Sequence, residues 1–376
     1  PNENNELLRA GAVKLRIPVE SIRRNVQGCW NLGSCGMGCP TNAKQSMLVT
    51  TLPVALEQGA TLLVQTRAER LEVASGKVQA LHCVGVQLNS TVAGDAARTR
   101  ITAKHYVLSG GAINSPAVLL RSQAPDPHGR LGQRTFLHPV LMQQRVEGWT
   151  GAPQSLCTDH FLETQAIDGP MGFKLEAPPL HPLILATTLP GMGQPQADLL
   201  RQFPHTHVLL ALLRDGFHEQ AQGGRVKLRG DGSAVLDYPL TDYVMDGARR
   251  AMLAMAEIQF AAGAQQVLPV HEMATLYSTW AQAKAAIEQL PMKPLLTKVV
   301  SAHVMGGCGL AADEKRGVVR PDGVHWQVEN LSVHDGSLFP TSVGANPQLS
   351  IYGIVNRLAQ GLVQRLTGQP QAQPLA

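Results

Sequence analysis

The sequence of 376 residues lacks the features of several classes of protein. No apolar run reaches the roughly 18–20 residues that a membrane-spanning helix needs. No block of like charges occurs either, because 32 basic and 28 acidic residues are spread along the chain and leave a net charge of +4. The composition therefore gives no support to a nucleic-acid-binding or anionic-membrane surface. Aromatic residues are scarce at 4%, yet 44% of the residues are hydrophobic, which is enough to bury a core and excludes wholesale disorder.

Cysteine is scarce as well. Six cysteines are too few to hold a chain of this length together by disulfides, and free thiols are the default of a reducing compartment. The sequence therefore favours a cytoplasmic location. The chain begins with Pro1 and shows no signal peptide, so we expect it to be processed or cut from a longer protein. A signal peptide upstream of Pro1 stays an open alternative.

Hydrophobic periodicity and turn residues predict a mixture of helices and strands. A β-meander is expected from three strands, over residues 61–73, 77–88 and 98–108. Two β-type runs around Asp231-Gly232 predict a hairpin over residues 225–239. Helices are expected over residues 48–59, 114–121, 246–263 and 350–366. The length and this mixture indicate an α/β protein of about two domains.

One histidine lies in a context that suggests chemistry. His303 stands just before Gly306-Gly307. About 30 residues later an apolar strand ends in Asp335-Gly336-Ser337, and Asn346-Pro347 opens the last helix. A strand end, a glycine turn and a helix N-terminus present unpaired backbone N–H groups, which together can bind an anion.

The order of these motifs resembles the C-terminal signature of the glucose–methanol–choline (GMC) flavoprotein oxidoreductases. The signature reads His-x-x-Gly-Gly, then Asn-Leu-x-Val-x-Asp-Gly-Ser-x-x-Pro, then Asn-Pro-x-x-x-Ile, and it spans His303 to Arg357. Residues 109–120 resemble a second signature of that family, and residues 129–139 resemble its crossover into the substrate domain. Residues 28–59 resemble a Cys/Gly loop and helix of one bacterial branch.

The resemblance implies an FAD-dependent enzyme that oxidises a CH–OH donor to an aldehyde or ketone by hydride transfer to flavin N5. His303 matches the active-site histidine, which takes or shares the hydroxyl proton, and an imidazole with its usual pKa near ~6.5 suits that exchange. Asn346 matches the second catalytic position, where an amide can hydrogen-bond the alcohol oxygen. An alternative interpretation of Asn346 is a helix N-cap before Pro347.

The resemblance also implies which residues contact FAD. The matching positions lie near the diphosphate and ribityl chain (Asp335 and Gly336), beside the isoalloxazine (Asn346, Pro347 and Gln348) and near the adenosine half (Gly111, Ala112 and, loosely, Arg70). A small or missing side chain at Gly111 and Ala112 lets the backbone approach a ligand closely. Asp335 has the alternative of being an ordinary turn residue.

The sequence departs from the family at one point. GMC members begin with a βαβ unit that carries Gly-x-Gly-x-x-Gly and places the FAD pyrophosphate on a helix N-terminus. This fingerprint is absent from the 376 residues. We therefore expect an N-terminally truncated chain with an incomplete FAD-binding domain, and we expect this fragment alone to be inactive.

Three cysteines, Cys29, Cys35 and Cys39, lie within eleven residues of a glycine-rich stretch. Closely spaced thiolates can hold an iron–sulfur cluster, whereas a zinc site needs a fourth ligand that no nearby residue supplies. The interpretation we favour is a tightly packed loop without a metal.

Together these observations predict three segments. Residues 1–135 and 298–376 are expected to form an incomplete Rossmann-like FAD-binding domain, and residues 136–297 an inserted α+β substrate domain on an antiparallel sheet. The expected partner is a small-molecule alcohol, and the electron acceptor is left open between oxygen, a quinone and a cytochrome. Two alternatives are a non-catalytic remnant and a dehydrogenase subunit with an iron–sulfur cluster at Cys29, Cys35 and Cys39.

Overall fold

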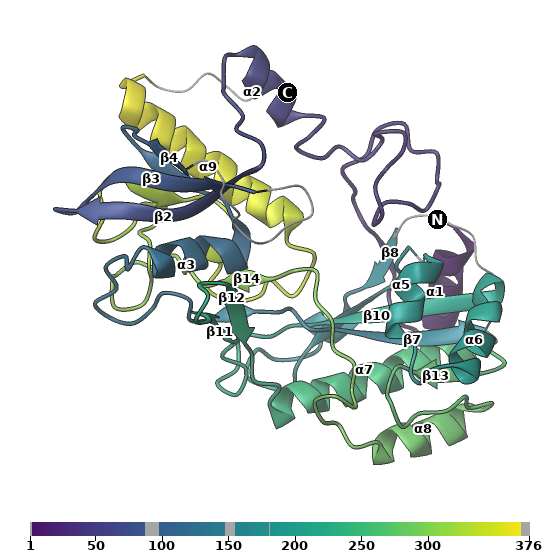
Figure 1. The fold of residues 1–376 in the computed structure, drawn as a ribbon. Coiled ribbons are helices and arrows are strands. Elements are labelled where there is room, and N and C mark those ends of the chain that lie inside the picture. Colours follow the sequence, from purple (N-terminus) through teal and green to yellow (C-terminus); the bar gives the residue numbers. More distant parts are fainter. Residues whose placement is uncertain (1, 87–97, 147–154, 180, 370–376) are drawn as a thin grey trace. The chain divides into compact units, whose positions relative to one another are not determined.

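The computed structural model describes residues 2–86, 98–146, 155–179 and 181–369, and for residues 142–146 the backbone alone. The chain divides into two compact units (Figure 1). Unit 1 consists of Pro1–Leu62, Pro139–Arg214 and Leu240–Ser301, and unit 2 consists of Leu63–His138, Asp215–Pro239 and Ala302–Ala376. No helix in the described ranges is long and apolar enough to span a membrane.

Unit 1 is built on a six-stranded antiparallel sheet with the order β1-β8-β9-β10-β7-β13. Its strands are β1 (Glu20–Ser21), β7 (Val140–Val146), β8 (Leu156–Thr158), β9 (Phe173–Glu176), β10 (Thr206–Leu213) and β13 (Val267–Pro269). Strand β10 reads Thr-His-Val-Leu-Leu-Ala-Leu-Leu, and seven of its eight residues are buried. Apolar residues on both faces suit a strand that is covered on both sides, and β10 is accordingly interior to the sheet.

The helices of unit 1 are α1 (Glu3–Lys14), α2 (Thr51–Glu57), α4 (His160–Glu163), α5 (Pro182–Thr188), α6 (Gln194–Arg201), α7 (Asp242–Ala261) and α8 (Trp280–Gln289). Helix α7 is capped by the Thr241 side chain and packs on β7 and β10 (Figure 1). Helix α1 crosses α7 so closely that a Cβ on Gly11 would lie 2.1 Å from the carbonyl oxygen of Ile258. The first helix is therefore an integral part of unit 1.

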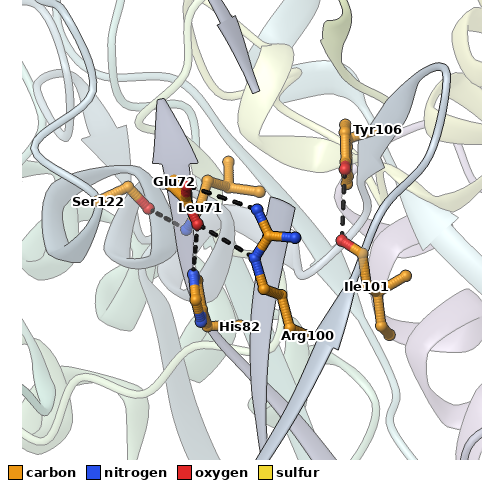
Figure 2. A network of polar contacts seen from close by, with 7 residues as sticks. All are labelled: Leu71, Glu72, His82, Arg100, Ile101, Tyr106 and Ser122. Atoms are coloured by element: carbon orange, nitrogen blue, oxygen red, sulfur yellow. Dashed lines mark hydrogen bonds and ion pairs between the residues drawn. The ribbon is translucent and has the colours of Figure 1, made fainter. Parts of the chain in front are cut away.

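Unit 2 contains a three-stranded antiparallel meander of β2 (Thr66–Ala74), β3 (Lys77–Gly85) and β4 (Arg98–Ile101). Across it, Glu72 accepts from His82 Nε2 at 3.0 Å and from Arg100 Nε at 3.3 Å (Figure 2). These hydrogen bonds, first that of His82 and then that of Arg100, lower the pKa of Glu72. The Leu71 N–H donates to Ser122 Oγ at 2.7 Å, which ties the meander to the end of α3 (Gly111–Arg121).

Two short parallel strands form the second sheet of unit 2. Strand β5 (Tyr106–Leu108) pairs with β15 (Leu331–Val333), and within the described residues this sheet has only these two strands. Strand β5 runs into α3, and β15 runs into the 3₁₀ turn η2 (Gly336–Leu338). Because parallel strands end at the same edge of a sheet, Asp335 comes to lie beside the first residue of α3.

The remaining elements of unit 2 are β6 (Thr135–Phe136), β11 (Arg225–Leu228), β12 (Ala234–Asp237), β14 (Met305–Gly306) and α9 (Gln348–Thr367). The core beneath them is mainly aliphatic and includes Leu71, Leu108, Leu119, Leu331, Val333 and Leu358. The expected α/β class and the antiparallel sheet of the inserted part are confirmed by these two units.

The hairpin β11–β12 and helices α3, α7 and α9 occur where the sequence predicts them. Residues 61–65 are expected to begin a strand but lie outside any strand. The helix expected over residues 48–59 is the shorter α2. The strand expected over 98–108 is two strands, because Tyr106 leaves the meander to pair with β15 while its hydroxyl donates to the Ile101 carbonyl at 3.3 Å (Figure 2). Residues 87–88 of the second expected strand lie outside the described ranges.

The grouping of the chain differs from the three expected segments in two places. Residues up to Leu62 belong to unit 1 and not with 63–135, because α1 packs on α7 and β1 pairs with β8. Residues Asp215–Pro239 belong to unit 2 although they lie inside 136–297, because the β11–β12 hairpin packs on α3.

Candidate active site

The expected catalytic histidine is one member of a histidine pair. Strands β6 and β14 pair antiparallel, with Phe136 opposite Met305 and Thr135 opposite Gly306. Extended by two residues, this register places His138 opposite His303. The two imidazoles stack with their centroids 5.3 Å apart, and their Nδ1 atoms lie at a hydrogen-bonding distance of 3.2 Å.

The two glycines after His303 have separate structural roles. Both have a positive φ, +84° at Gly306 and +99° at Gly307, which an L side chain rarely adopts. A Cβ on Gly306 would lie 2.0 Å from the Arg134 carbonyl oxygen, and one on Gly307 would lie 3.0 Å from Pro116 Cγ. The Gly-Gly dipeptide therefore lets β14 press against both β6 and α3.

His138 itself is completely buried and has a φ of +51°. Just before it, the buried Phe136 ring fits against Gly216 and Gly223, where a Cβ would come within 2.7 Å of ring carbons. The Arg134 guanidinium lies over this ring, 5.2 Å from its centroid. This packing fixes the backbone that carries His138.

Two polar side chains bind the chain that precedes Asn346 to the rest of unit 2, one to the His138 segment and one to Asp215. Arg134 donates to the carbonyl oxygens of Gly216, at 2.9 Å, and Pro340, at 3.1 Å. Ser342 Oγ donates to the Asp215 carbonyl at 2.7 Å. We call Arg134, His138, Asp215, Tyr238 and Ser342 the crossover network.

Asp215 is the buried acid of the crossover network. Its carboxylate accepts from the Tyr238 hydroxyl at 2.6 Å, and its residue has no exposed surface. Burial raises the pKa of Asp215 to about 6, against the opposing hydrogen bonds of Tyr238, Ser342 and the His138 backbone. Burial and the neighbouring Asp215 charge in turn raise the pKa of Tyr238.

Asp335 uses its carboxylate within the protein. It accepts from the Gly111 N–H at 2.8 Å and Ser115 Oγ at 2.5 Å, and from the N–H and Oγ of Ser337 at 2.8 and 2.5 Å. A carboxylate at the first residue of α3 also interacts favourably with the helix dipole. Asp335 therefore joins the end of β15 to α3, which is a positioning role for the loop it belongs to.

Gly336 lies where the His303 and Asn346 segments come together. A Cβ on Gly336 would lie 3.2 Å from Ile351 Cδ1 in the first turn of α9 and 3.7 Å from the Val304 carbonyl oxygen. Pro347, not Asn346, is the N-cap of α9, and it makes no side-chain capping bond. Asn346 is half-buried, Pro347 is buried, and Gln348 is exposed and donates to the Tyr352 hydroxyl. The alternative of Asn346 as a plain N-cap is thus not what this helix shows.

The other expected FAD contacts lie on α3 and β2. Gly111 has a φ of +78°, and a Cβ there would meet nothing within 4 Å, so its backbone faces open space. Ala112 is buried beside it. Arg70 is an exposed residue of β2 opposite His82, at a β-bulge between Ala68 and Arg70. Arg70 and Gly111 are far apart in the sequence, but the elements that carry them are joined. Arg121 Nε, at the end of α3, donates to the carbonyl of Glu69 in β2 at 2.7 Å.

Residues 27–43 form a closed loop in unit 1, which we call the cysteine loop. Its neck is a backbone bridge between Val26 and Lys44, with the Gln27 N–H donating to the Ala43 carbonyl at 2.8 Å. Cys29, Cys35 and Cys39 are half-buried free thiols that line one cavity of about 20 Å³. Across the described part of the chain, no group of three or more His, Cys, Asp or Glu side chains is arranged to hold a metal ion.

The sequence alone does not single out His138, Arg134 or Asp215. His138 stands 165 residues before its partner, and only the pairing of β6 with β14 brings the two together. The Leu-His-Pro tripeptide at the end of the crossover segment 129–139 is the available signal, and a histidine in an apolar segment is more often a core residue than a functional one. Nothing in the sequence around Asp215 indicates that this residue is buried.

Comparisons with known proteins agree on one family. The GMC oxidoreductase family models match residues 1–140 and 220–354. The long-chain-alcohol oxidase FAO4A of Arabidopsis thaliana is 26% identical over 96% of this chain and 51% of its own length. A GMC-type oxidoreductase of Mycobacterium tuberculosis is 28% identical over 97% of this chain and 55% of its own length. The chain thus spans about half the length of the curated relatives that it matches.

Solved structures show the same fold at low sequence identity. Pyridoxine 4-oxidase from Mesorbium loti superposes with a TM-score of 0.63 at 16% identity, covering 96% of this chain and 70% of that chain. The two matching segments of the family models cover more than half of the 376 residues, in the order in which the motifs occur. The chain belongs to the GMC oxidoreductase family.

Proposed function

We propose that this chain carries the alcohol-binding and proton-transferring part of an FAD-dependent oxidoreductase that converts a CH–OH donor to an aldehyde or ketone. Membership of the family supports the reaction class. Several relatives are long-chain-alcohol oxidases of Arabidopsis thaliana, so long-chain alcohols are the first substrates to test.

The observation that supports this proposal most directly is the meeting point at Gly336. The residue after His303 contributes its carbonyl there, and the first turn of α9, which begins two residues after Asn346, contributes Ile351. Two side chains that the family uses together are thus carried on segments that pack against the same glycine. Their backbones are held by β6 on one side and by Ser342 and Pro340 on the other.

In this proposal His303 accepts the hydroxyl proton of the alcohol on an imidazole nitrogen. An imidazole is suited to this step because it changes charge near neutral pH. Asn346 donates an amide hydrogen bond to the alcohol oxygen and so orients the hydroxyl proton toward His303. Neither residue has to move far if both segments are held as observed, which lowers the entropic cost of reaching the reacting geometry.

The described residues fit an extended dinucleotide. The side of Gly111 that a Cβ would occupy is open at the start of α3. Asp335 holds that turn through two hydrogen bonds, which it accepts from the Gly111 N–H and from Ser115 Oγ. We propose that Gly111, Ala112 and Arg70 line the adenosine half, and that Asp335, Gly336, Asn346, Pro347 and Gln348 line the diphosphate, ribityl and isoalloxazine parts. FAD, when bound, supplies the acceptor for the hydride that leaves the alcohol carbon.

The test uses the full-length protein purified with FAD. Anaerobic mixing with primary alcohols of increasing chain length should bleach the visible flavin absorbance, and His303→Ala should lower that rate by about 10²–10⁴ at unchanged FAD content. His128→Ala, which removes a partly exposed surface histidine of unit 2, serves as the matched control and should react normally. An unchanged rate in His303→Ala contradicts the role of His303, and a protein that retains no flavin contradicts the whole proposal.

A further inference from the structure

We propose that His138 is a positioning residue that fixes the tautomer of His303, so that His303 carries its proton on Nδ1 and presents Nε2 as the base. This inference rests on the proposed function, which selects the tautomer, and the tautomer can be measured on the chain without cofactor or substrate.

The contact between the two rings admits one shared proton. Their Nδ1 atoms lie 3.2 Å apart, so one nitrogen must donate and the other must accept. If His303 donates, its Nε2 keeps a lone pair and can take a proton from an alcohol. If His138 donates instead, His303 carries its proton on Nε2 and can only give a hydrogen bond there. The reaction proposed for His303 requires the first arrangement.

His138 is built to be the fixed member of the pair. It is completely buried, whereas His303 is half-buried. Its φ of +51° is uncommon for a residue other than glycine, and the pairing of β6 with both β14 and Gly224 holds it there. A ring that is already fixed by packing orients its partner better than a mobile surface ring would, because the fixed ring loses less rotamer freedom when the contact forms.

The surroundings of His138 hold its backbone from two directions. On one side, the Phe136 ring packs against Gly216 and Gly223. On the other, the His138 backbone interacts with the buried Asp215. Orienting a base through the nitrogen that does not react is a general solution in enzymes, and loss of such a partner typically lowers activity by about 10–100-fold.

In the resulting step the O–H bond of the alcohol breaks and an N–H bond forms at His303 Nε2. The imidazolium that results keeps its Nδ1–H directed at His138 Nδ1, so the new positive charge has an acceptor already in place. The proton at Nδ1 is not transferred, and His138 stays neutral throughout.

The primary experiment measures the tautomer directly. Nitrogen-15 NMR of the histidine-labelled chain, without FAD or alcohol, distinguishes protonation at Nδ1 from protonation at Nε2. His138→Asn and His303→Gln assign the signals. We expect the Nδ1–H form of His303 in the wild type, and we expect His138→Leu, which removes the acceptor, to shift His303 toward the Nε2–H form.

His138→Asn is the conservative variant. Asparagine tolerates a positive φ, and its side-chain oxygen offers an acceptor where Nδ1 now lies. It should retain the Nδ1–H form of His303, whereas His138→Leu should not. In the full-length enzyme, His138→Leu should lower the rate constant for flavin reduction by about 10–100-fold with little change in KM, and His138→Asn should restore most of it.

Each outcome decides the inference. The Nε2–H form of His303 in the wild type overturns it, whatever the activity of the enzyme. So does a wild-type rate of flavin reduction in His138→Leu alongside a changed tautomer. If no alcohol reduces the flavin in any variant while the NMR result is as expected, the tautomer control by His138 stands and the proposed function fails.

Discussion

The crossover network in unit 2 and the cysteine loop in unit 1 both gather reactive side chains, but the chain holds them by different means. In the crossover network His138, Asp215 and Ser342 are buried, and the strand β6 that leads to His138 is fixed by backbone pairing on two sides, through β14 and through Gly224. The cysteine loop is closed only at its neck, and its side chains Trp30, Leu32 and Met37 are at least half exposed. The crossover network is held mainly by contacts between segments far apart in the sequence, whereas the cysteine loop is held at its neck and by local hydrogen bonds within the loop.

The two regions shift the pKa of an acidic side chain in opposite directions. Removal from water raises the pKa of Asp215 to about 6, because the charged form loses its hydration. In the cysteine loop, hydrogen bonds from the Lys44 backbone and the Thr41 side chain lower the pKa of Cys39 to about 7. Desolvation dominates in the buried region, and hydrogen-bond donors dominate in the exposed one.

The largest expected effect compares Gly306, in the strand β14 that pairs beside the crossover network, with Gly38 in the cysteine loop. Gly306→Ala and Gly38→Ala both place a side chain at a positive φ, +84° and +111°, so they share the conformational strain. At Gly306 the new Cβ would lie 2.0 Å from the Arg134 carbonyl oxygen, whereas at Gly38 it would meet nothing within 4 Å. We expect Gly306→Ala to lower the free energy of unfolding by about 4 kcal/mol or more, and Gly38→Ala by about 1–2 kcal/mol.

Urea denaturation of the two variants measures this difference. Gly309→Ala is the control for a glycine close to Gly306, since a Cβ there meets nothing within 4 Å and its φ is not positive. It should behave almost as the wild type. Equal losses in Gly306→Ala and Gly38→Ala would mean that packing at β14 adds nothing to the strain, and that the two regions are equally tolerant.

An intermediate effect is expected from Asp215, in the form of a dependence of stability on pH. Its pKa in the folded state, about 6, lies above the unfolded value of 3.8, so between these values the folded state binds more protons. Stability contributed by this proton is therefore present below about pH 4 and is lost as the pH rises through 6. The full shift corresponds to on the order of 2–3 kcal/mol.

Asp215→Asn isolates this contribution because an amide cannot ionise, while its oxygen can still accept from Tyr238. The difference in unfolding free energy between variant and wild type should favour the variant more at pH 8 than at pH 4. A difference that does not change with pH would show that Asp215 is hydrated and that the crossover network is not dry.

The local elements of both regions follow from the sequence, whereas the contacts between them do not. The positive φ values of Gly306 and Gly307 agree with the Gly-Gly motif. An apolar run followed by Ser-Gly-Gly likewise predicts the unit formed by β5, a glycine turn and α3. His138 pairs with a strand 165 residues away, and no local pattern states that register. The same is true of Tyr106, which local β-propensity extends from β4 but which long-range pairing moves to β15.

For the candidate site, the order of the motifs predicts which residues take part, but not which neighbouring groups hold them in place. His303 and Asn346 are predicted as site residues because short motifs surround them. The same holds for Asp335, but the hydrogen bonds that it accepts from Gly111 and Ser115 depend on two parallel strands that end at one edge of the sheet. A sequence shows which side chains are available, and the folded chain determines which of them are already engaged.

The smallest expected effect on stability is at Cys39, whose thiol pKa is lowered to about 7. Cys39→Ser should change the melting temperature by no more than about 1 °C, because its side chain is half-exposed in a loop closed elsewhere. Its thiol, with a pKa of about 7, should react with iodoacetamide at neutral pH well before Cys157, whose pKa burial raises to about 12. Thr41→Val, which removes a hydrogen bond to the Cys39 sulfur, should slow that reaction severalfold while leaving Cys157 unchanged. Timed alkylation followed by mass spectrometry of the peptides gives both rates. Equal rates at Cys39 and Cys157, or no effect of Thr41→Val, would mean that hydrogen bonds in the cysteine loop do not activate the thiol, and the contrast with the buried Asp215 would then have to be one of exposure alone.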